Sequence, residues 1–213
     1  MEVKVEQETE WKRALNAART TIGKEAINKN PSSLWEARVL LAEHAPIKLV
    51  EYKISFKQLK QWVGVHLLRH GFQIPMIHSQ RGDRRDLRDE YPKIEEIYNL
   101  IKDDLMNPSL RDCLPQGAPN DQDFYVNAQT LINISRKRLC SCASKETREA
   151  WQLVKQAISE IDPIMASKMV RECVYRGFCP EMFPACKYCQ TPEYQEELKE
   201  YRKEAKNVMY IDK

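Results

Sequence analysis

The chain has 213 residues, of which 31% are charged and 42% are hydrophobic, and this suits one domain with its own buried core. Its formal net charge of +3 is too small to indicate nucleic-acid binding, so no nucleic-acid partner is expected. Since no apolar run approaches the roughly 20 residues that span a bilayer, and the first residues lack the apolar core of a signal peptide, we expect a cytoplasmic protein without a membrane partner.

The first part of the chain is predicted to hold two helices, a strand and a third helix. Apolar side chains recur at helical spacing in residues 8–24. Pro31 breaks this helix, and the serines after it can cap a second helix that ends at Ala42. Residues 49–56 alternate and are rich in β-branched and aromatic residues, which predicts a strand. Residues 59–67 show the spacing of a helix that packs on it.

The second part is predicted to be mostly helical, after a short extended run at 74–80 and a polar loop. Further helices are expected at residues 92–105, 127–146, 144–161, 163–174 and 192–206. We expect the chain to be organised around the helix at 127–146. No Gly or Pro occurs between Asp121 and Arg148, and Asn120 or Asp121 can cap the start of this helix.

This central helix carries polar groups on an apolar stripe. At about 100° per residue, the members of the stripe are Asn127, Leu131, Ile134 and Arg138. A guanidinium is a good ligand for phosphate because its planar fork donates two hydrogen bonds. Three basic residues follow one another at 136–138, so the solvated basic end of a helix is the other reading of this stretch.

Three groups of polar residues precede or lie on the central helix. They are Arg69-His70 with Ser79-Gln80-Arg81, then Arg111-Asp112-Cys113-Leu114-Pro115, then Asn127-Ala128-Gln129-Thr130-Leu131 with Asn133, Arg138 and Ala143 to Glu146. In order and spacing they resemble the signatures of the flavin-dependent thymidylate synthases, across roughly residues 44–148. Those signatures are Arg-His-Arg followed after seven residues by Ser-x-Arg, then Arg-x-x-Leu-Pro, then a long helix that opens Asn-Ala-Arg-x-Leu.

The chain also departs from these signatures. The departures are His66 for Gln, Gly71 for Arg, Met76-Ile77 for Asn-Glu, Gly82 for Tyr and Gln129 for Arg. Polar neighbours could replace the lost groups locally: His78, Asp83, Arg84 and Arg85. The departures could equally mark a divergent subfamily with an altered substrate or reaction.

The resemblance implies an α+β fold, with an antiparallel sheet flanked by helices and a long central helix, and a homotetramer with shared active sites. It implies that FAD is bound and reduced by NADPH, and that a methylene group passes from methylenetetrahydrofolate to C5 of dUMP. We therefore expect reductive methylation of dUMP to dTMP. Two alternatives stay open: a hydroxymethylase or methylase of dUMP or dCMP that serves modified DNA, and a non-catalytic nucleotide-binding homologue.

The resemblance also implies a role for each matched residue. The expected catalytic residues are Ser79, Arg81 and Arg138. The expected substrate-binding residues are His66, Ser79, Gln80, Arg81, Arg111 and Arg138. The expected cofactor-binding residues are His44, Arg69, His70, Asn127 and Asn133. His66 lies on the apolar face of its predicted helix and can equally be a packed core residue.

The seven cysteines are expected to be thiols or metal ligands rather than disulfides in a cytoplasmic protein. Four of them crowd into one short segment: Cys173, Cys179, Cys186 and Cys189. Four thiolates can bind zinc tetrahedrally, so a structural zinc site is one reading and buried free thiols are the other. We therefore divide the chain into a synthase-like domain at 1–172 and a Cys-rich knot with a C-terminal helix at 173–213, packed on the same body.

Overall fold

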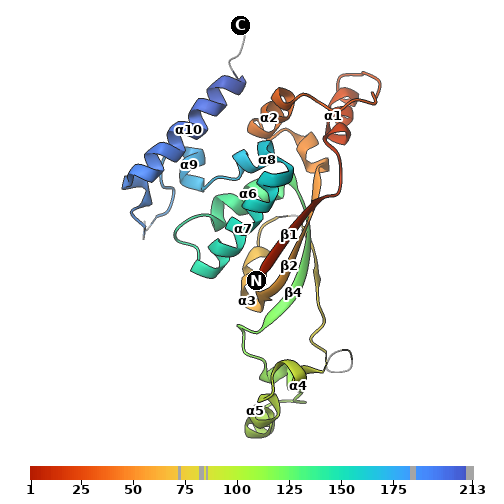
Figure 1. Ribbon diagram of the computed structural model, residues 1–213, viewed down its shortest axis with the longest axis vertical. Helices are drawn as coiled ribbons and strands as arrows, with labels where there is room; N and C mark the ends of the chain where they lie inside the picture. The colour runs from red at the N-terminus through yellow and green to blue at the C-terminus, as the bar shows by residue number, and fades with distance from the viewer. Residues whose placement is uncertain (72, 82–83, 85, 183–185, 210–213) are drawn as a thin grey trace.

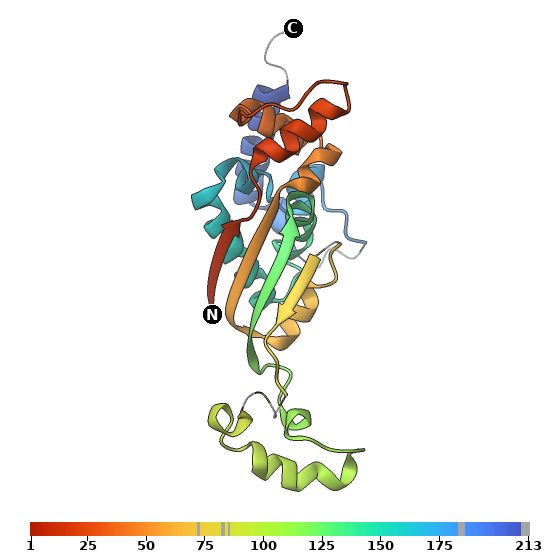
Figure 2. The ribbon, with the colours of Figure 1, turned by 90° about the vertical axis from the view of Figure 1, so that its right-hand side faces the viewer.

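The computed structural model of the protein describes residues 1–71, 73–81, 84, 86–182 and 186–209. Four antiparallel strands form one sheet in the order β1-β2-β4-β3. They are β1 (Glu2–Gln7), β2 (Glu51–Lys60), β3 (Gln73–Ile77) and β4 (Pro119–Asn127). Helices cover one face of the sheet, and the other face is open (Figures 1 and 2). The expected α+β fold with an antiparallel sheet is confirmed.

The main core lies between the sheet and the helices. The helices of this body are α1 (Trp11–Thr20), α2 (Ser33–Leu41), η1 (Ala45–Leu49), α3 (Gln61–Leu67), α6 (Ala128–Arg138), α7 (Lys145–Ile161) and α8 (Pro163–Lys168). Alternate residues of β2 and β4 point into this core. Phe56 and Phe124 meet there edge to face, with ring centroids 5.7 Å apart. Trp151 of α7 is also buried, and its indole Nε1 donates to Ser135 Oγ of α6 at 2.9 Å.

The central helix is shorter than the sequence predicted. Residues 119–127 form β4, so Asn120 and Asp121 lie in a strand and do not cap the helix. Asn127 is the cap instead, since its side-chain oxygen accepts from the Thr130 backbone nitrogen at 2.9 Å. The helix ends at Arg138, and a six-residue connection at 139–144 separates it from α7. The sequence contains no Gly or Pro to mark this break.

Other boundaries also differ from the prediction. Residues 2–7 form the strand β1, which was not predicted, and α1 therefore begins at Trp11. The predicted helix at 163–174 is two helices, α8 and α9 (Glu172–Arg176). The predicted cap of α2 is confirmed, because Ser32 Oγ accepts from the Trp35 backbone nitrogen at 3.3 Å.

Residues 86–114 form a lobe that extends beyond one end of the sheet (Figures 1 and 2). It contains α4 (Leu87–Glu90), α5 (Ile94–Ile101), η2 (Lys102–Asp104) and η3 (Leu110–Cys113). A small apolar cluster of its own, centred on Leu87, Ile94 and Cys113, holds these helices together. Gly82, Asp83 and Arg85, which the sequence analysis singled out, lie outside the described residues.

The C-terminal segment packs against the helical layer. It comprises α9, η4 (Tyr188–Gln190) and α10 (Pro192–Met209). Val174, Tyr194 and Leu198 form its buried cluster. Near its end, the Val208 carbonyl oxygen accepts from Arg38 Nε of α2 at 2.8 Å. No helix among the described residues combines the length and the apolar character needed to cross a membrane.

Candidate functional site

A cluster of basic side chains forms where the end of α3 meets the last turn of α6. Its members are His66, Arg69, His70, Lys137 and Arg138. The Arg138 guanidinium is held against α3, because its Nη2 donates to the His66 carbonyl oxygen at 2.7 Å. Burial and the positive charge of Arg69 lower the pKa of Arg138. Within the described part of the chain, no carboxylate forms an ion pair with Arg69 or Arg138, so this positive charge is left for a ligand to neutralise.

Two buried nitrogen atoms of the cluster lack a protein partner among the described residues: His70 Nε2 and Arg138 Nε. Burial, together with the charges of Arg138, Lys137 and Arg69, lowers the pKa of His70 to about 4. His70 is therefore neutral at pH 7 and can make one further hydrogen bond. Buried polar atoms are almost always hydrogen-bonded in folded proteins, so these two nitrogens are available to a bound group or to water.

The sequence left two roles open for His66, a substrate-binding residue and a packed core residue, and the structure has features of both. Its ring is half-buried and packs edge to face on Trp62 with centroids 5.2 Å apart. Its Nδ1 lies 3.5 Å from the Thr147 hydroxyl oxygen, at the limit of a hydrogen bond. Burial and the nearby arginines Arg138 and Arg69 lower the pKa of His66. The imidazole is thus both a packed group and a member of the basic cluster.

Gly71 takes the place of an arginine in the family signature, and its backbone conformation suits glycine. Its φ of +69° lies in the left-handed region, which strains any residue with a Cβ. A Cβ at this position would lie 3.9 Å from the Thr130 hydroxyl, so space is not the limit. An arginine here would strain this backbone or require a different conformation after α3.

Asn127 and Asn133 lie at the start and middle of α6. Asn127 borders a hollow of about 340 Å³ on the open face of the sheet, together with Ile74, Met76 and Tyr125. Met76 is 57% exposed, and this apolar side chain stands where the family carries a polar one. Asn133 is exposed, and its Oδ1 accepts from Gln129 Nε2 at 3.3 Å.

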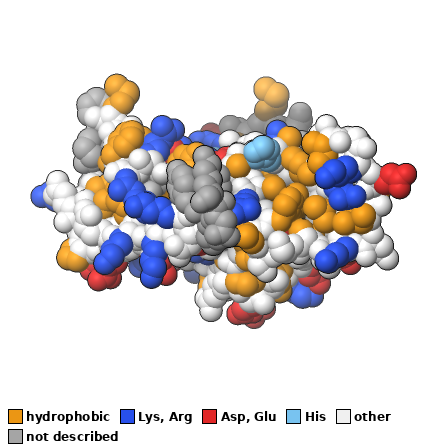
Figure 3. Space-filling model, turned by 90° about the horizontal axis from the view of Figure 1, so that it is seen from above, with side chains coloured by type: hydrophobic (Ala, Val, Ile, Leu, Met, Phe, Trp, Pro, Cys, Tyr) orange, Lys and Arg blue, Asp and Glu red, His pale blue; other side chains and the backbone are white. Residues whose placement is uncertain are grey.

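His44 lies on a different hollow. It precedes η1 and is exposed, and it borders a hollow of about 550 Å³ between α1, α2 and η1. Trp35, Val39 and Arg38 line the same hollow. Figure 3, which views this end of the molecule, shows apolar and basic side chains gathered on this surface.

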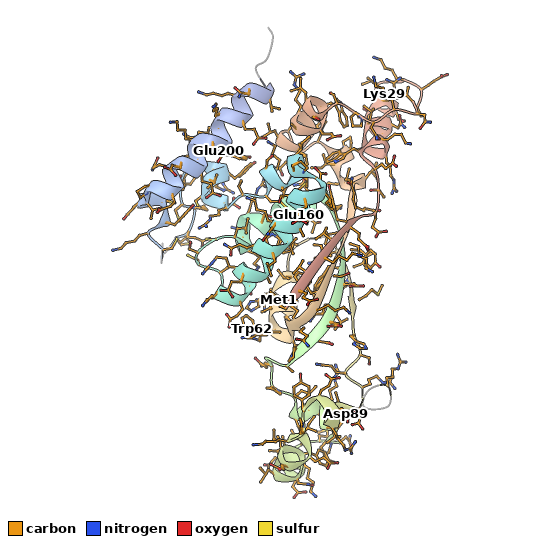
Figure 4. The ribbon with its side chains drawn as sticks, viewed as in Figure 1. Met1, Lys29, Trp62, Asp89, Glu160 and Glu200 are labelled. Carbon is orange, nitrogen blue, oxygen red and sulfur yellow. The ribbon has the colours of Figure 1, made fainter. Side chains whose placement is uncertain are left out.

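The remaining predicted residues lie in the lobe or on the segment that leads into it. Ser79, Gln80 and Arg81 follow β3 on the way into the lobe, where the Arg81 backbone nitrogen donates to Ser79 Oγ at 3.3 Å. Arg111 is exposed in η3 of the lobe, in a turn held by the Ser109–Asp112 capping box. The lobe points away from the layer that holds α3 and α6 (Figure 1). Figure 4 shows the same separation between Trp62 beside the sheet and Asp89 in the lobe.

Six of the seven cysteines gather around the connection between α6 and α7 and the C-terminal segment, and the seventh, Cys113, lies in the lobe. The Cys142 thiol contacts those of Cys140 and Cys186, and the Cys189 thiol contacts those of Cys173 and Cys179. Burial and neighbouring thiols raise the pKa of Cys142 to about 11 and that of Cys173 to about 12. In the described residues, no three His, Cys, Asp or Glu side chains are arranged to hold a metal ion. The zinc site therefore stays a prediction.

Sequence reasoning missed Glu43 and Arg136, which form an ion pair beside the flavin-binding residues predicted on α6. Arg136 was visible only as one member of the basic run at 136–138. Glu43 precedes His44, and nothing in the local pattern marks it. The signal in the sequence was Gln129, which stands where the family has an arginine and whose side chain donates to Glu43.

Comparison with known families decides the assignment. A family model described as thymidylate synthase complementing protein, Thy1, matches residues 7–164. The chain belongs to this family. The match confirms the family that the motifs indicated, and the chain is an enzyme of the thymidylate synthase-like methyltransferase type. A search of curated proteins finds no significant match.

Solved structures with low sequence identity share the fold. A flavin-dependent thymidylate synthase ThyX from Helicobacter pylori, complexed with FAD and dUMP, is 16% identical with a TM-score of 0.63. The likeness covers 80% of this chain and 100% of that one. A UMP/dUMP methylase, PolB from Streptomyces cacaoi, bound with 5-Br dUMP, is 15% identical with a TM-score of 0.56. This second likeness covers 83% of this chain and 96% of PolB.

Proposed function

We propose that this protein methylates dUMP reductively to dTMP, with FAD as cofactor, NADPH as reductant and methylenetetrahydrofolate as carbon donor. Family membership supports this reaction, and so do the FAD and dUMP in the related ThyX structure. The observation that carries the proposal is the basic cluster at the end of α3 and α6, which has positive charge and two buried nitrogens without protein partners among the described residues. Anionic phosphates fit such a group.

In this proposal, the chain's own residues bind and orient the ligands. Arg138 holds the nucleotide, and its fork is already fixed against the His66 carbonyl. Arg69 and neutral His70 face the flavin or its phosphates, where the buried His70 Nε2 finds a hydrogen-bond partner. Asn127 and Asn133 add amide hydrogen bonds from α6. Bound FAD, once reduced, supplies the hydride that completes the methyl group.

We further propose that the active site is shared between subunits of a homotetramer. The two groups of predicted ligands, one at α3 and α6 and one in and near the lobe, are separate in one chain (Figure 1). A neighbouring subunit that brings its Ser79, Arg81 and Arg111 against the basic cluster would complete the site. The projecting lobe, with only a small core of its own, suits such a role.

A second candidate is a methylase or hydroxymethylase of a related pyrimidine nucleotide. The observation that favours it is the exposed apolar pair Met76 and Ile77, 57% and 40% exposed, in place of the Asn-Glu of the family. A lost carboxylate beside the base changes which exocyclic group is recognised. The likeness to PolB, a UMP/dUMP methylase, is consistent with this candidate.

The visible spectrum of the purified protein tests the proposal. We expect a flavin band, present on purification or after addition of FAD, that dUMP perturbs. Incubation with methylenetetrahydrofolate, NADPH and dUMP should then yield dTMP. Formation of 5-hydroxymethyl product, or turnover of UMP or dCMP in preference to dUMP, would favour the second candidate. Absence of any flavin binding would refute both.

A further inference from the structure

A hydrogen-bonded chain of side chains lies along α6, next to the predicted flavin contacts. Arg136 Nη2 forms an ion pair with Oε1 of Glu43, which lies in the turn after α2. The other carboxylate oxygen of Glu43 accepts from Gln129 Nε2 at 2.6 Å. Gln129 Nε2 also donates to Asn133 Oδ1 at 3.3 Å. Four side chains are thus linked in the order Arg136, Glu43, Gln129 and Asn133.

The Glu43 carboxylate is ionised and held firmly. Burial raises its pKa, but the hydrogen bonds from Arg136 and Gln129 outweigh this, and the net pKa is lowered. The side chains of Arg136 and Glu43 are 14% and 23% exposed, so the pair is not a solvated surface salt bridge. Glu43 also has a left-handed backbone with φ of +47°, which non-glycine residues seldom adopt.

The C-terminal segment also contacts Arg136 and Glu43, through Tyr175. The Arg136 guanidinium stacks over the Tyr175 ring of α9 at 3.6 Å from its centroid. The Tyr175 side chain also hydrogen-bonds to the Glu43 carboxylate. Tyr175 lies beyond residues 7–164, which match the family model. The α9 segment is therefore connected to the central helix through Arg136.

The chemistry of these groups fixes the direction of every hydrogen bond. An ionised carboxylate only accepts, so Gln129 must turn its NH₂ group toward Glu43. That same nitrogen then faces Asn133, so Asn133 must present its oxygen to Gln129. Asn133 is left with its NH₂ group turned outward, on the exposed side of α6. The charge of Glu43 thus determines that Asn133 offers donors, and not an acceptor, to a ligand.

We propose that Glu43 and Arg136 are positioning residues that orient Asn133 so that its amide NH₂ donates to the bound flavin cofactor. This inference rests on the proposed function, in which Asn133 contacts the flavin or its phosphates. Phosphate oxygens and flavin carbonyls both need donors. We call the four linked side chains, Arg136, Glu43, Gln129 and Asn133, the relay. It gives Gln129 a role: where the family has an arginine, this chain has a neutral side chain that orients the donor group of Asn133.

The variant Glu43→Gln tests the relay. With one acceptor oxygen in place of two, the introduced amide must use that oxygen for Arg136 and turn its own NH₂ toward Gln129. Gln129 then presents its oxygen to Asn133, and Asn133 turns its oxygen toward the ligand. We expect the Kd for FAD, measured by fluorescence quenching, to rise roughly tenfold or more. Glu43→Asp keeps an acceptor-only carboxylate and should recover part of the affinity.

A double variant shows whether Glu43 acts through Asn133. In an Asn133→Ala background, adding Glu43→Gln should change the Kd for FAD by less than about twofold, because coupled residues are non-additive. Glu204→Gln is the matched control, since Glu204 of α10 pairs with the buried Lys168 and forms no hydrogen bond with Arg136, Glu43, Gln129 or Asn133 among the described residues. It should leave the Kd for FAD at the wild-type value.

Each outcome decides the inference. An unchanged Kd in Glu43→Gln or in Asn133→Ala, or additive effects in the double variant, would overturn it while leaving the proposed function standing. Wild-type protein that binds no FAD would instead overturn the proposed function, and with it the proposal that the relay orients Asn133 toward FAD. Should Glu43→Gln fail to fold, Gln129→Ala removes the relay directly, and its effect on the Kd must vanish in the Asn133→Ala background.

Discussion

Replacing Arg138 with methionine should weaken dUMP binding while leaving the free energy of unfolding nearly unchanged. The guanidinium donates one hydrogen bond, to the His66 carbonyl, and no carboxylate among the described residues pairs with it. Losing that bond costs about 1 kcal/mol. Removing a half-buried positive charge next to Arg69 offsets this cost, because the repulsion that lowers the pKa of Arg138 disappears. We therefore expect a free energy of unfolding within about 1 kcal/mol of wild type.

The affinity for dUMP should fall steeply in the same variant. Charge-assisted hydrogen bonds contribute about 1.5–3 kcal/mol each, so the Kd for dUMP should rise roughly 10- to 150-fold. Isothermal titration calorimetry with dUMP and thermal unfolding measure the two quantities. The pKa of His70, about 4 in the wild type, should also move upward in an NMR titration, because Arg138 is its strongest charged neighbour.

Arg148→Met is the matched control for this prediction. Arg148 is half-buried and donates from Nη1 to the carbonyl oxygens of Ser141 and Ala143, both at 3.2 Å, so it supports the connection after α6. This variant should lose stability and keep its affinity for dUMP. A folded Arg138→Met protein with wild-type affinity for dUMP would refute the assignment of Arg138.

Three further predictions test other parts of the molecule. Arg111→Ala should weaken dUMP binding and leave FAD bound, whereas Asn127→Ala should do the reverse; normal binding of both ligands by both variants would show that the roles are misassigned. Because the pKa of His70 is depressed to about 4, the unfolded chain binds more protons between that value and about 6.5; stability should therefore fall on acidification through this window, and His70→Gln should flatten that slope in chemical denaturation. Cys142 is exposed as a residue, but its thiol contacts those of Cys140 and Cys186 and its pKa is raised to about 11, so alkylation by iodoacetamide, followed by mass spectrometry, should be slower at pH 7 than that of an unperturbed thiol and rise with pH; modification as fast as that of a free cysteine at pH 7 would contradict that.

Two of the strands, β1 and β4, were not predicted because their sequence patterns are weak. The buried face of β4 begins with two polar residues, Asn120 and Gln122, which are each 2% exposed. Asn120 Nδ2 donates to the His78 carbonyl at 2.9 Å, and Gln122 Nε2 lies 3.4 Å from Gln61 Oε1. These partners are distant in the sequence and meet only in the folded chain. Because the buried positions at the start of β4 are polar, the sequence shows no apolar alternation there. The edge strand β1 has only Val3 and Val5 to signal it.

The helices were easier to predict because burial and periodicity coincide. In α7, Trp151, Val154 and Ile158 recur at helical spacing, and all three are buried. The positions of the candidate site were predicted from motif spacing, which needs no tertiary information. The relay behind α6 could not be found this way, since Glu43 and Arg136 are 93 residues apart in the chain and meet only where the turn after α2 lies against α6.

If the projecting lobe completes the active site of a neighbouring subunit, as proposed, two defective chains can restore activity to one another. If each site takes its basic cluster from one subunit and its lobe from another, Arg111→Ala and Arg138→Met damage opposite halves of the site. Mixed after dissociation and reassembly, the two inactive proteins should form sites in which both halves are intact. Random assembly of an equal mixture makes about a quarter of the sites whole. Such recovery, which depends on subunit exchange and disappears on dilution, distinguishes a shared site from one that each chain builds alone.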